Sequence, residues 1–200
     1  MASPPTPKIE IVDHFLPQAL NQRILRFAID READFVPSTV EGEVTKTNLR
    51  HSMRFDENLN ELEEEFGNHM DEAIGQILES LGVPAFEPDS YEVELVAHGD
   101  GAFYKPHIDT FTRQQRSEVT SDRVVSCVYY LHSKPKGFDG GKLALFQIGK
   151  NTPFSSIEPV NNRLIAFPSF VMHEVEAISC PSGKFDKSRF AINCWVHRKI

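Results

Sequence analysis

The chain has 200 residues, of which 40% are hydrophobic and 25% are charged, and its formal net charge is -8. This balance is typical of a soluble globular protein that buries a core without disulfides, and the length alone predicts one or two domains. The acidic excess argues against a nucleic-acid partner, because such partners usually meet a basic surface.

The cysteines and the N-terminus bear on where the protein works. The three cysteines are odd in number and form no CxxC pair, which argues against a disulfide framework or a zinc knuckle and favours a reducing compartment. The first residues lack the apolar core of a signal peptide, and no apolar run approaches the roughly 18 residues of a membrane span. We therefore expect a cytoplasmic protein with no membrane association. The sequence carries no signal for the oligomeric state.

The chain begins with a segment that is expected to be irregular. Residues 1–8 are rich in proline and are predicted to form a loose tail. A short strand is predicted over residues 9–12. Pro17 then suits the first turn of a helix, since the apolar residues that follow it recur at helical spacing.

A flap and a long helix are predicted next. Residues 34–56 have mixed character and are predicted to form a strand-loop-strand flap, with turns at Val36-Pro37-Ser38 and Glu41-Gly42-Glu43. The clearest helix covers residues 58–81, where one apolar stripe runs along its whole length. Gly82 and Pro84 are predicted to end it.

The second half of the chain is rich in predicted strands. Residues 91–96 alternate as a half-buried strand does. Five further short strands, separated by Gly, Pro, Asn or Asp, are predicted at residues 102–108, 123–131, 142–148, 162–168 and 188–197. Short strands with regular turns are typical of a sandwich or a barrel. We therefore expect a single domain over residues 1–200, mainly β with an α flank, in which residues 9–90 provide helical support and the flap and residues 91–197 form the core.

One candidate metal site stands out. His107-Ile108-Asp109 is an HxD pair, and residues i and i+2 of a strand point to the same face. His173 follows at the end of the strand predicted over 162–168. Two histidines and one carboxylate can bind one face of an octahedral ion and leave three positions open, which is the pattern of non-haem Fe(II) oxygenases. An HxD pair also occurs by chance, and His107 would then be an ordinary surface or turn residue.

The last predicted strand offers a carboxylate-binding group. Its alternation places Arg189, Ala191, Asn193 and Trp195 on one face. A solvated outer face would alternate in the same way, but Trp and Ala are poor choices for one. A guanidinium suits a polar cavity, where it can bind a carboxylate through two parallel hydrogen bonds. The hydroxyl of Tyr130 could bind the same carboxylate.

Other pocket candidates leave more than one role open. Asn193 and Trp195 are expected to line the cavity, although simple core packing explains Trp195 equally well. Tyr104 either flanks the pocket or packs on the outer face. Arg50 and Arg54, in the flap, either contact substrate or have a solvated or structural role. The histidines that fit no ligand spacing, and to which no role is assigned, are His14, His51, His69, His98, His132 and His197.

The ordered motifs of the second half resemble the prolyl-4-hydroxylase-like branch of the 2-oxoglutarate/Fe(II) oxygenases, including its hypoxia-sensing type. The matching segments occur in family order across about residues 91–197, at residues 101–109, 123–131, 140–146, 157–159, 163–167, 173–175 and 189–195. The resemblance implies a double-stranded β-helix (jelly-roll) core supported by N-terminal helices. It also implies that His107, Asp109 and His173 bind iron, and that Arg189, with Tyr130 beside it, binds the distal carboxylate of 2-oxoglutarate.

The resemblance further implies a dioxygenase that hydroxylates an unactivated C–H bond while 2-oxoglutarate and O2 become succinate and CO2. The favoured substrate is a prolyl residue in a protein or peptide, and ascorbate would be an additional cofactor. One alternative is a hydroxylase of a free amino acid or another small metabolite. Another is a catalytically silent ligand-sensing or scaffold module. A cupin-type metalloenzyme is also open, but it would not explain Arg189. No side-chain acid or base is assigned.

Two departures from the family pattern are visible. Many relatives carry a tyrosine where this chain has Ala97, which is expected either to leave room in the pocket or to change a substrate contact. The spacer between His173 and Arg189 is also longer than in the hypoxia-sensing type. We expect its segment 180–184 to form a surface loop.

Overall fold

The computed structural model describes residues 5–39, 48–111, 113–116 and 119–200. The turn predicted at residues 41–43 lies outside this part of the chain, as do residues 1–4 of the predicted tail. Residues 5–8 form neither helix nor strand. No described helix combines the length and the apolar character needed to span a membrane.

Two long helices precede the main strands. α1 (Gln18–Asp30) begins directly after Pro17 and buries Leu20, Ile24 and Ala28 along one face. α2 (Glu61–Leu81) buries its predicted apolar stripe and ends at Gly82, whose φ of 69° is the left-handed conformation that glycine adopts without strain. The short elements α3 (Arg113–Arg116), η1 (Glu32–Asp34) and η2 (Phe185–Lys187) lie in connections.

The described strands form two large antiparallel sheets. The seven-stranded sheet has the order β1 (Glu10–Asp13), β11 (Arg163–Pro168), β7 (Ser121–Leu131), β14 (Arg189–Lys199), β5 (Ser90–His98), β4 (Met53–Phe55) and β2 (Phe35–Pro37). The five-stranded sheet has the order β10 (Pro153–Ile157), β9 (Leu143–Phe146), β12 (Met172–Val175), β6 (Phe103–His107) and β3 (Arg50–His51). A small ribbon pairs β13 (Ile178–Ser179) with β8 (Asp139–Gly140).

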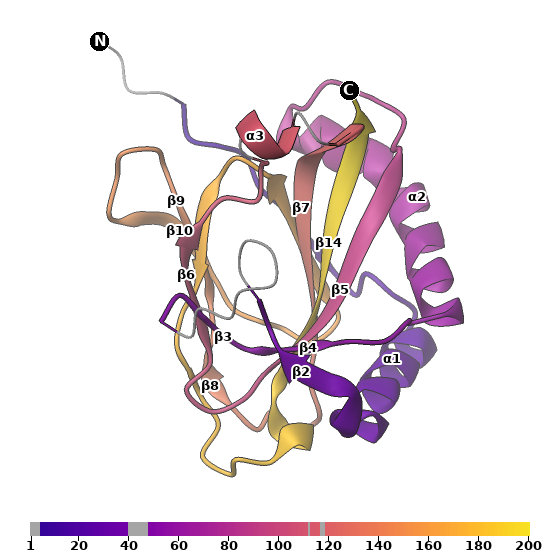
Figure 1. Cartoon of the computed structure of the whole chain (residues 1–200), viewed down its shortest axis with the longest axis vertical. Coiled ribbons are helices and arrows are strands. Elements are labelled where there is room, and N and C mark those ends of the chain that lie inside the picture. The colour runs from indigo at the N-terminus through magenta and orange to yellow at the C-terminus, as the bar shows by residue number, and fades with distance from the viewer. Residues whose placement is uncertain (1–4, 40–47, 112, 117–118) are drawn as a thin grey trace.

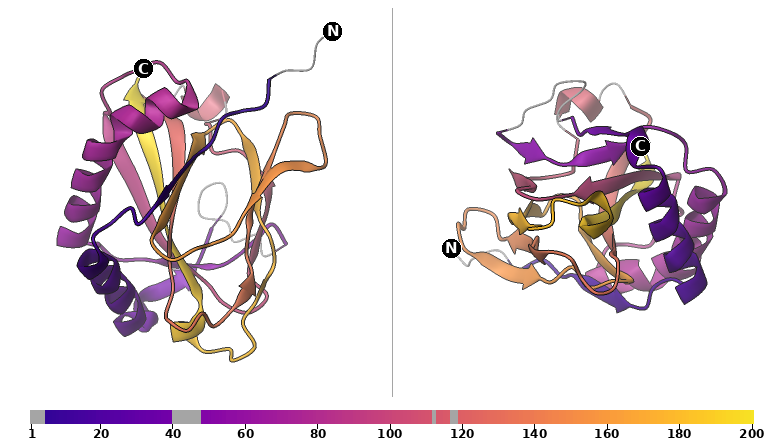
Figure 2. Two further views of the ribbon diagram at one scale, coloured as in Figure 1. Left: turned by 180° about the vertical axis from the view of Figure 1, so that it is seen from behind. Right: turned by 90° about the horizontal axis from the view of Figure 1, so that it is seen from below.

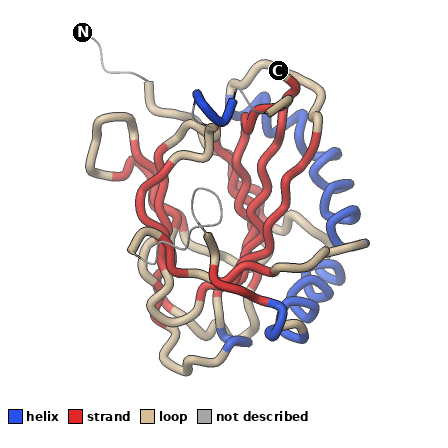
Figure 3. Tube along the Cα trace, in the orientation of Figure 1, coloured by secondary structure: helices blue, strands red, loops and turns tan. Residues whose placement is uncertain are grey.

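The elements stack in three layers, as Figures 1 and 2 show. The helices α1 and α2 cover the outer face of the seven-stranded sheet, and the main apolar core lies between them. A second apolar cluster lies between the two sheets and draws on both, for example through Ile165 and Leu145. The helices cover only one side of the large sheet, and the small sheet lies on its other side (Figure 3). Residues of both sheets line a cavity between them.

Each strand predicted in the second half is present, with both ends within two residues of the predicted ones, but four short strands escaped prediction. These are β8, β10, β12 and β13, and β12 carries His173. The prediction that His173 ends the 162–168 strand was therefore wrong. That strand stops at Pro168, and a turn in which the Val171 N–H donates to the Pro168 carbonyl (2.9 Å) leads into β12. A four-residue strand next to a turn is too short to show a two-residue period.

The predicted flap is only partly a separate element. β2 pairs with β4, and β4 pairs with β5, so both extend the large sheet. The turn predicted at Val36-Pro37-Ser38 was therefore wrong, because Val36 and Pro37 belong to β2. β3 pairs with β6 and instead extends the small sheet. The described parts of the segment that was expected to form a flap therefore belong to both sheets.

Asn162 ties the N-terminal segment to the core and suggests a stability test. Its side chain accepts hydrogen bonds from the Leu16 N–H and the Tyr129 hydroxyl (both 2.9 Å) and donates to the Leu16 carbonyl (2.8 Å), while its φ is 64°. We expect Asn162→Ala to lower the free energy of unfolding by about 2–4 kcal/mol. The free energy of unfolding should fall by about 1 kcal/mol less in Asn162→Gly. Glycine loses the same hydrogen bonds, but it adopts the left-handed conformation without strain. Urea unfolding measures the stability of both variants. An equal loss of stability in the two would show that the left-handed conformation of residue 162 adds no cost for alanine.

Candidate active site

The two candidate histidine ligands face each other across a strand pair. β12 runs antiparallel to β6, and His173 is the direct partner of His107. Their ring centroids are 4.1 Å apart. Tyr104, on the same strand as His107, stacks on its imidazole at 3.6 Å between centroids, so the ring orientation of His107 is held by packing.

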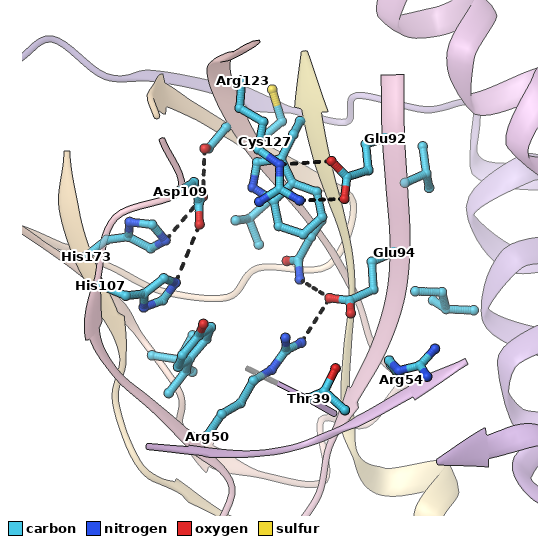
Figure 4. A pocket seen from close by; sticks show the side chains of 18 of the residues that line it. Thr39, Arg50, Arg54, Glu92, Glu94, His107, Asp109, Arg123, Cys127 and His173 are labelled. Atoms are coloured by element: carbon cyan, nitrogen blue, oxygen red, sulfur yellow. Dashed lines mark hydrogen bonds and ion pairs between the residues drawn. The ribbon is translucent and has the colours of Figure 1, made fainter. Parts of the chain in front are cut away.

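Asp109 completes the cluster from just beyond the end of β6. The strand stops at His107, and the N–H groups of Asp109 and Thr110 both donate to the Ser169 carbonyl (3.0 and 3.2 Å). The Asp109 carboxylate lies 3.6 Å from Nε2 of His107 and 3.5 Å from Nε2 of His173. One donor atom from each of the three residues lies within 4.8 Å of the others, so together they could hold a metal ion. Figure 4 shows the three side chains converging on one point.

Hydrogen bonds and burial prepare these groups to act as ligands. Nδ1 of His107 lies 2.8 Å from the Lys105 carbonyl, and Nδ1 of His173 lies 2.9 Å from the Val171 carbonyl. A carbonyl only accepts, so each Nδ1 carries the proton and each Nε2 presents its lone pair to the cluster. Burial, together with the neighbouring His173, lowers the pKa of His107 to about 3, which keeps its imidazole neutral.

Asp109 is held as a carboxylate. Burial by itself would raise its pKa, but the neighbouring His173 and His107 act in the opposite direction, and the net effect is a lowered pKa. Hydrogen bonds from the Ser126 hydroxyl (2.7 Å) and the Trp195 side chain act in the same direction. The cluster therefore offers two imidazole nitrogens and one carboxylate as donors.

Arg189 lies on the opposite sheet, deep in the molecule. It is 1% exposed, and its guanidinium lies 5.1 Å from the centre of the Tyr130 ring. Nη1 donates to the Gly141 carbonyl (2.9 Å). Within the described residues, Nε of Arg189 and the Tyr130 hydroxyl are both buried without a hydrogen-bond partner. Burial raises the pKa of Tyr130, so its hydroxyl keeps its proton and can donate.

His98 is a site residue that the sequence analysis missed. Nη2 of Arg189 lies 3.1 Å from Nδ1 of His98, and His98 is 3% exposed and lines the cavity. The position of His98 along the alternating strand could have identified it. Continuing the alternation of residues 91–96 by one step places His98 on the same face as Glu92 and Glu94.

The same alternation corrects the expectation for Ala97. Its side chain belongs to the apolar core between the large sheet and the helices, and Ala97 is the strand partner of Phe190. Ala97 therefore leaves no room in the pocket, because it points to the other face of the sheet. Of the surface loop predicted over residues 180–184, residues 181–184 are exposed, but the prediction was wrong at Cys180, which is buried.

A cavity of about 720 Å³ connects the His107, Asp109 and His173 cluster with Arg189 and His98. All five of the less certain pocket candidates line it, namely Asn193, Trp195, Tyr104, Arg50 and Arg54. Tyr130 does not line the cavity but lies in the apolar cluster between the sheets. Arg54, on β4, pairs with Asp56 (2.5 Å).

Two ion pairs organise the cavity. Arg50 bonds Glu94 (2.9 Å), which also accepts from the Asn193 amide (3.2 Å), so this pair joins the small sheet to the large one (Figure 4). Arg123 binds Glu92 through two hydrogen bonds and packs over the Trp195 ring at 4.2 Å. Neither carboxylate was a candidate in the sequence, because nothing local relates residues on different strands.

Comparisons with known proteins agree with this geometry. Residues 93–197 match the 2OG-Fe(II) oxygenase superfamily. The chain is 33% identical, over 198 residues, to an uncharacterized PKHD-type hydroxylase of Synechocystis sp.; the match covers 94% of this chain, but the chain spans only 63% of the length of that relative. The chain therefore belongs to the 2OG-Fe(II) oxygenase superfamily.

Solved structures place it near the prolyl hydroxylases. A Pseudomonas putida prolyl-4-hydroxylase has a TM-score of 0.69 and 25% identity, over 96% of this chain and 94% of that one. A Trichoplax adhaerens prolyl hydroxylase, in complex with a hypoxia inducible factor oxygen degradation domain peptide fragment, has a TM-score of 0.72 and 22% identity, over 96% and 84%. The core is thus the double-stranded β-helix that was predicted, and the recognition of a prolyl hydroxylase-like oxygenase is confirmed.

The Arg50–Glu94 pair suggests a second stability test. Arg50 is 8% exposed and Glu94 is 21% exposed, so removing the carboxylate leaves a nearly buried cation without its partner. We expect Glu94→Ala to lower the free energy of unfolding by about 2 kcal/mol, which is less than the cost at a fully buried pair. Glu65→Ala is the matched control, since it breaks the exposed Arg23–Glu65 pair and should cost under about 1 kcal/mol. Similar losses in the two variants would refute a structural role for the Arg50–Glu94 bridge.

Proposed function

We propose that this protein is an Fe(II)- and 2-oxoglutarate-dependent dioxygenase whose iron is bound by His107, Asp109 and His173. The observation that carries the proposal is the convergence of these donors within 4.8 Å, with both Nδ1 atoms tied to backbone carbonyls. Two imidazoles and one carboxylate are the donor set of non-haem Fe(II) sites that keep open positions for other ligands.

We further propose that Arg189 and Tyr130 bind the distal carboxylate of 2-oxoglutarate. The support is the buried Nε and hydroxyl, which lack partners within the described residues. Leaving such groups unsatisfied is costly, and a carboxylate would satisfy both with charge-assisted hydrogen bonds. The fit therefore rests on two independent features, the metal donors on one sheet and the unpartnered polar atoms on the other.

The residues of this chain act by holding and orienting. When bound, iron and 2-oxoglutarate would supply the oxidising power that activates O2, with succinate and CO2 as products. Asp109 and the two histidines would hold the metal, and Arg189 would orient the co-substrate. The walls of the cavity would limit the access of water. No side-chain acid or base is needed, and ascorbate would serve only to keep the metal reduced.

For the substrate we propose a prolyl residue in a peptide or protein. The support is the likeness to prolyl hydroxylases, one of which was solved with a peptide. The cavity also suits a proline ring, since Trp195 and Tyr104 present aromatic surface beside the candidate metal site. We also propose a cytoplasmic location, on the basis of the sequence.

A free amino acid is the second candidate, and one observation favours it. Arg50 and Glu94 form an ion pair within the cavity. The two charges match the carboxylate and the ammonium of an α-amino acid, which could exchange with the pair on binding. A catalytically silent module remains the alternative from another class, and the intact donor cluster argues against it.

The cofactor assignment is tested by binding. Fe(II) followed by 2-oxoglutarate, added anaerobically to the metal-free protein, should produce the visible charge-transfer absorption of a chelate. Asp109→Ala should weaken metal binding by more than about 100-fold, because even outer partners of ligands contribute 10- to 100-fold. Arg189→Ala should keep the metal but weaken 2-oxoglutarate binding by roughly 100-fold. Arg198→Ala, an exposed site on the same strand, is the control. Folded protein without any absorption change would favour the silent module.

The substrate class is tested by turnover. Succinate formation should rise when proline-containing peptides are added and stay at background with free proline and other amino acids. Mass spectrometry should find a gain of one oxygen on the prolyl residue. Stimulation by free amino acids alone would instead support the second candidate.

A further inference from the structure

His98 occupies a position that no assigned role explains. It is the last residue of β5, next to Arg189 in the strand register, and both side chains are almost completely buried. Burying an imidazole and a guanidinium side by side is costly unless each hydrogen-bonds. Nη2 of Arg189 makes such a contact with Nδ1 of His98 at 3.1 Å.

This contact determines which nitrogen of His98 carries the proton. A guanidinium only donates, so Nδ1 must accept and the proton must lie on Nε2. Burial, and then the charges of Arg189 and Arg50, lower the pKa of His98 well below its usual value, which keeps the ring neutral. His98 is therefore an acceptor on one edge and a donor on the other.

The donor edge has nothing to bind within the described part of the chain. No described residue hydrogen-bonds Nε2, whereas His98 lines the cavity. The Tyr130 hydroxyl and Nε of Arg189 are likewise unpartnered. Three donors of buried residues around one guanidinium thus lack an acceptor. One carboxylate, with about four lone-pair sites, could accept from all of them.

We propose that His98 is a third binding group for the distal carboxylate of 2-oxoglutarate, with Nε2–H donating to it while Nδ1 holds Arg189 in place. The proposal rests on the proposed function and adds a neutral donor to the assigned pair of Arg189 and Tyr130. His98 would thus act as a co-substrate-binding residue and, at the same time, as a positioning residue for Arg189.

The surroundings of Arg189 make this arrangement rigid. Nη1 donates to the carbonyl of Gly141 (2.9 Å), while Nη2 contacts His98. Gly141 has a φ of 69°, and a Cβ there would lie 2.6 Å from Ile178 and 3.3 Å from the Arg189 side chain. The guanidinium is therefore held between a backbone carbonyl and an imidazole before any ligand enters, which reduces the entropic cost of binding.

Two amide variants separate the two edges of the ring. In His98→Asn, the side-chain oxygen can replace Nδ1 as the acceptor for Arg189, but nothing reaches the position of Nε2. In His98→Gln, the amide nitrogen can replace Nε2–H as the donor. His98→Phe removes both functions and keeps the volume.

The measurement is calorimetric binding of 2-oxoglutarate to the Mn(II)-loaded protein. We expect His98→Phe and His98→Asn to weaken binding about 10- to 100-fold, as for a lost hydrogen bond to a charged group, and His98→Gln to stay within about 10-fold of the wild type. Mn(II) affinity should not change. With 2-oxobutanoate, which lacks the distal carboxylate, the loss in His98→Phe should vanish.

The contrary outcomes are distinct. If His98→Asn kept the wild-type affinity for 2-oxoglutarate and His98→Gln did not, the proposed hydrogen bond from Nε2 to the distal carboxylate would be wrong. His98 would then only anchor Arg189. Wild-type affinity in all three variants, or an equal loss with 2-oxobutanoate, would overturn the proposed hydrogen bond as well. If His98→Phe fails to fold, the contrast between the two amides decides alone. Failure of the proposed function is separate, because wild-type protein would then bind no 2-oxoglutarate.

Discussion

The site depends on one strand pairing, that of β12 with β6. Antiparallel hydrogen bonding places His173 directly opposite His107, so two imidazoles from distant parts of the chain meet at a fixed spacing. The turn before β12 then supplies the Ser169 carbonyl that anchors the backbone of Asp109. If the pairing slipped by one residue, His173 would point to the other face and the cluster would be lost.

The second constraint is that the metal donors and Arg189 lie on different sheets. The candidate metal site belongs to the small sheet, whereas Arg189 and His98 belong to the large one. The helices cover the apolar outer face of the large sheet. Its inner face carries both the second apolar cluster and the polar residues that line the cavity. The cavity walls are then joined by the Arg50–Glu94 pair, which bridges the two sheets. The architecture thus keeps a polar cavity stable by giving most of its buried charges partners.

Patterns within one strand were the most informative part of the sequence. The HxD pair and the alternation after Arg189 predicted which side chains share a face, and the cavity is lined by Asn193 and Trp195 as expected. The same alternation explains why the expectation for Ala97 was wrong. Ala97 faces the helices, and its neighbour His98 faces the cavity. The strand that carries His173 was missed because four residues beside a turn show no period.

The sequence by itself determined the class of fold, the three candidate metal donors and Arg189, because each depends on local spacing or on ordered motifs. Only the tertiary structure decided what lies between strands. The register that joins His173 to His107, the bridge from Arg50 to Glu94 and the contact of His98 with Arg189 all connect residues that are distant in the chain. Long-range pairing of this kind leaves no local periodicity, so it becomes visible only when the two sheets face each other.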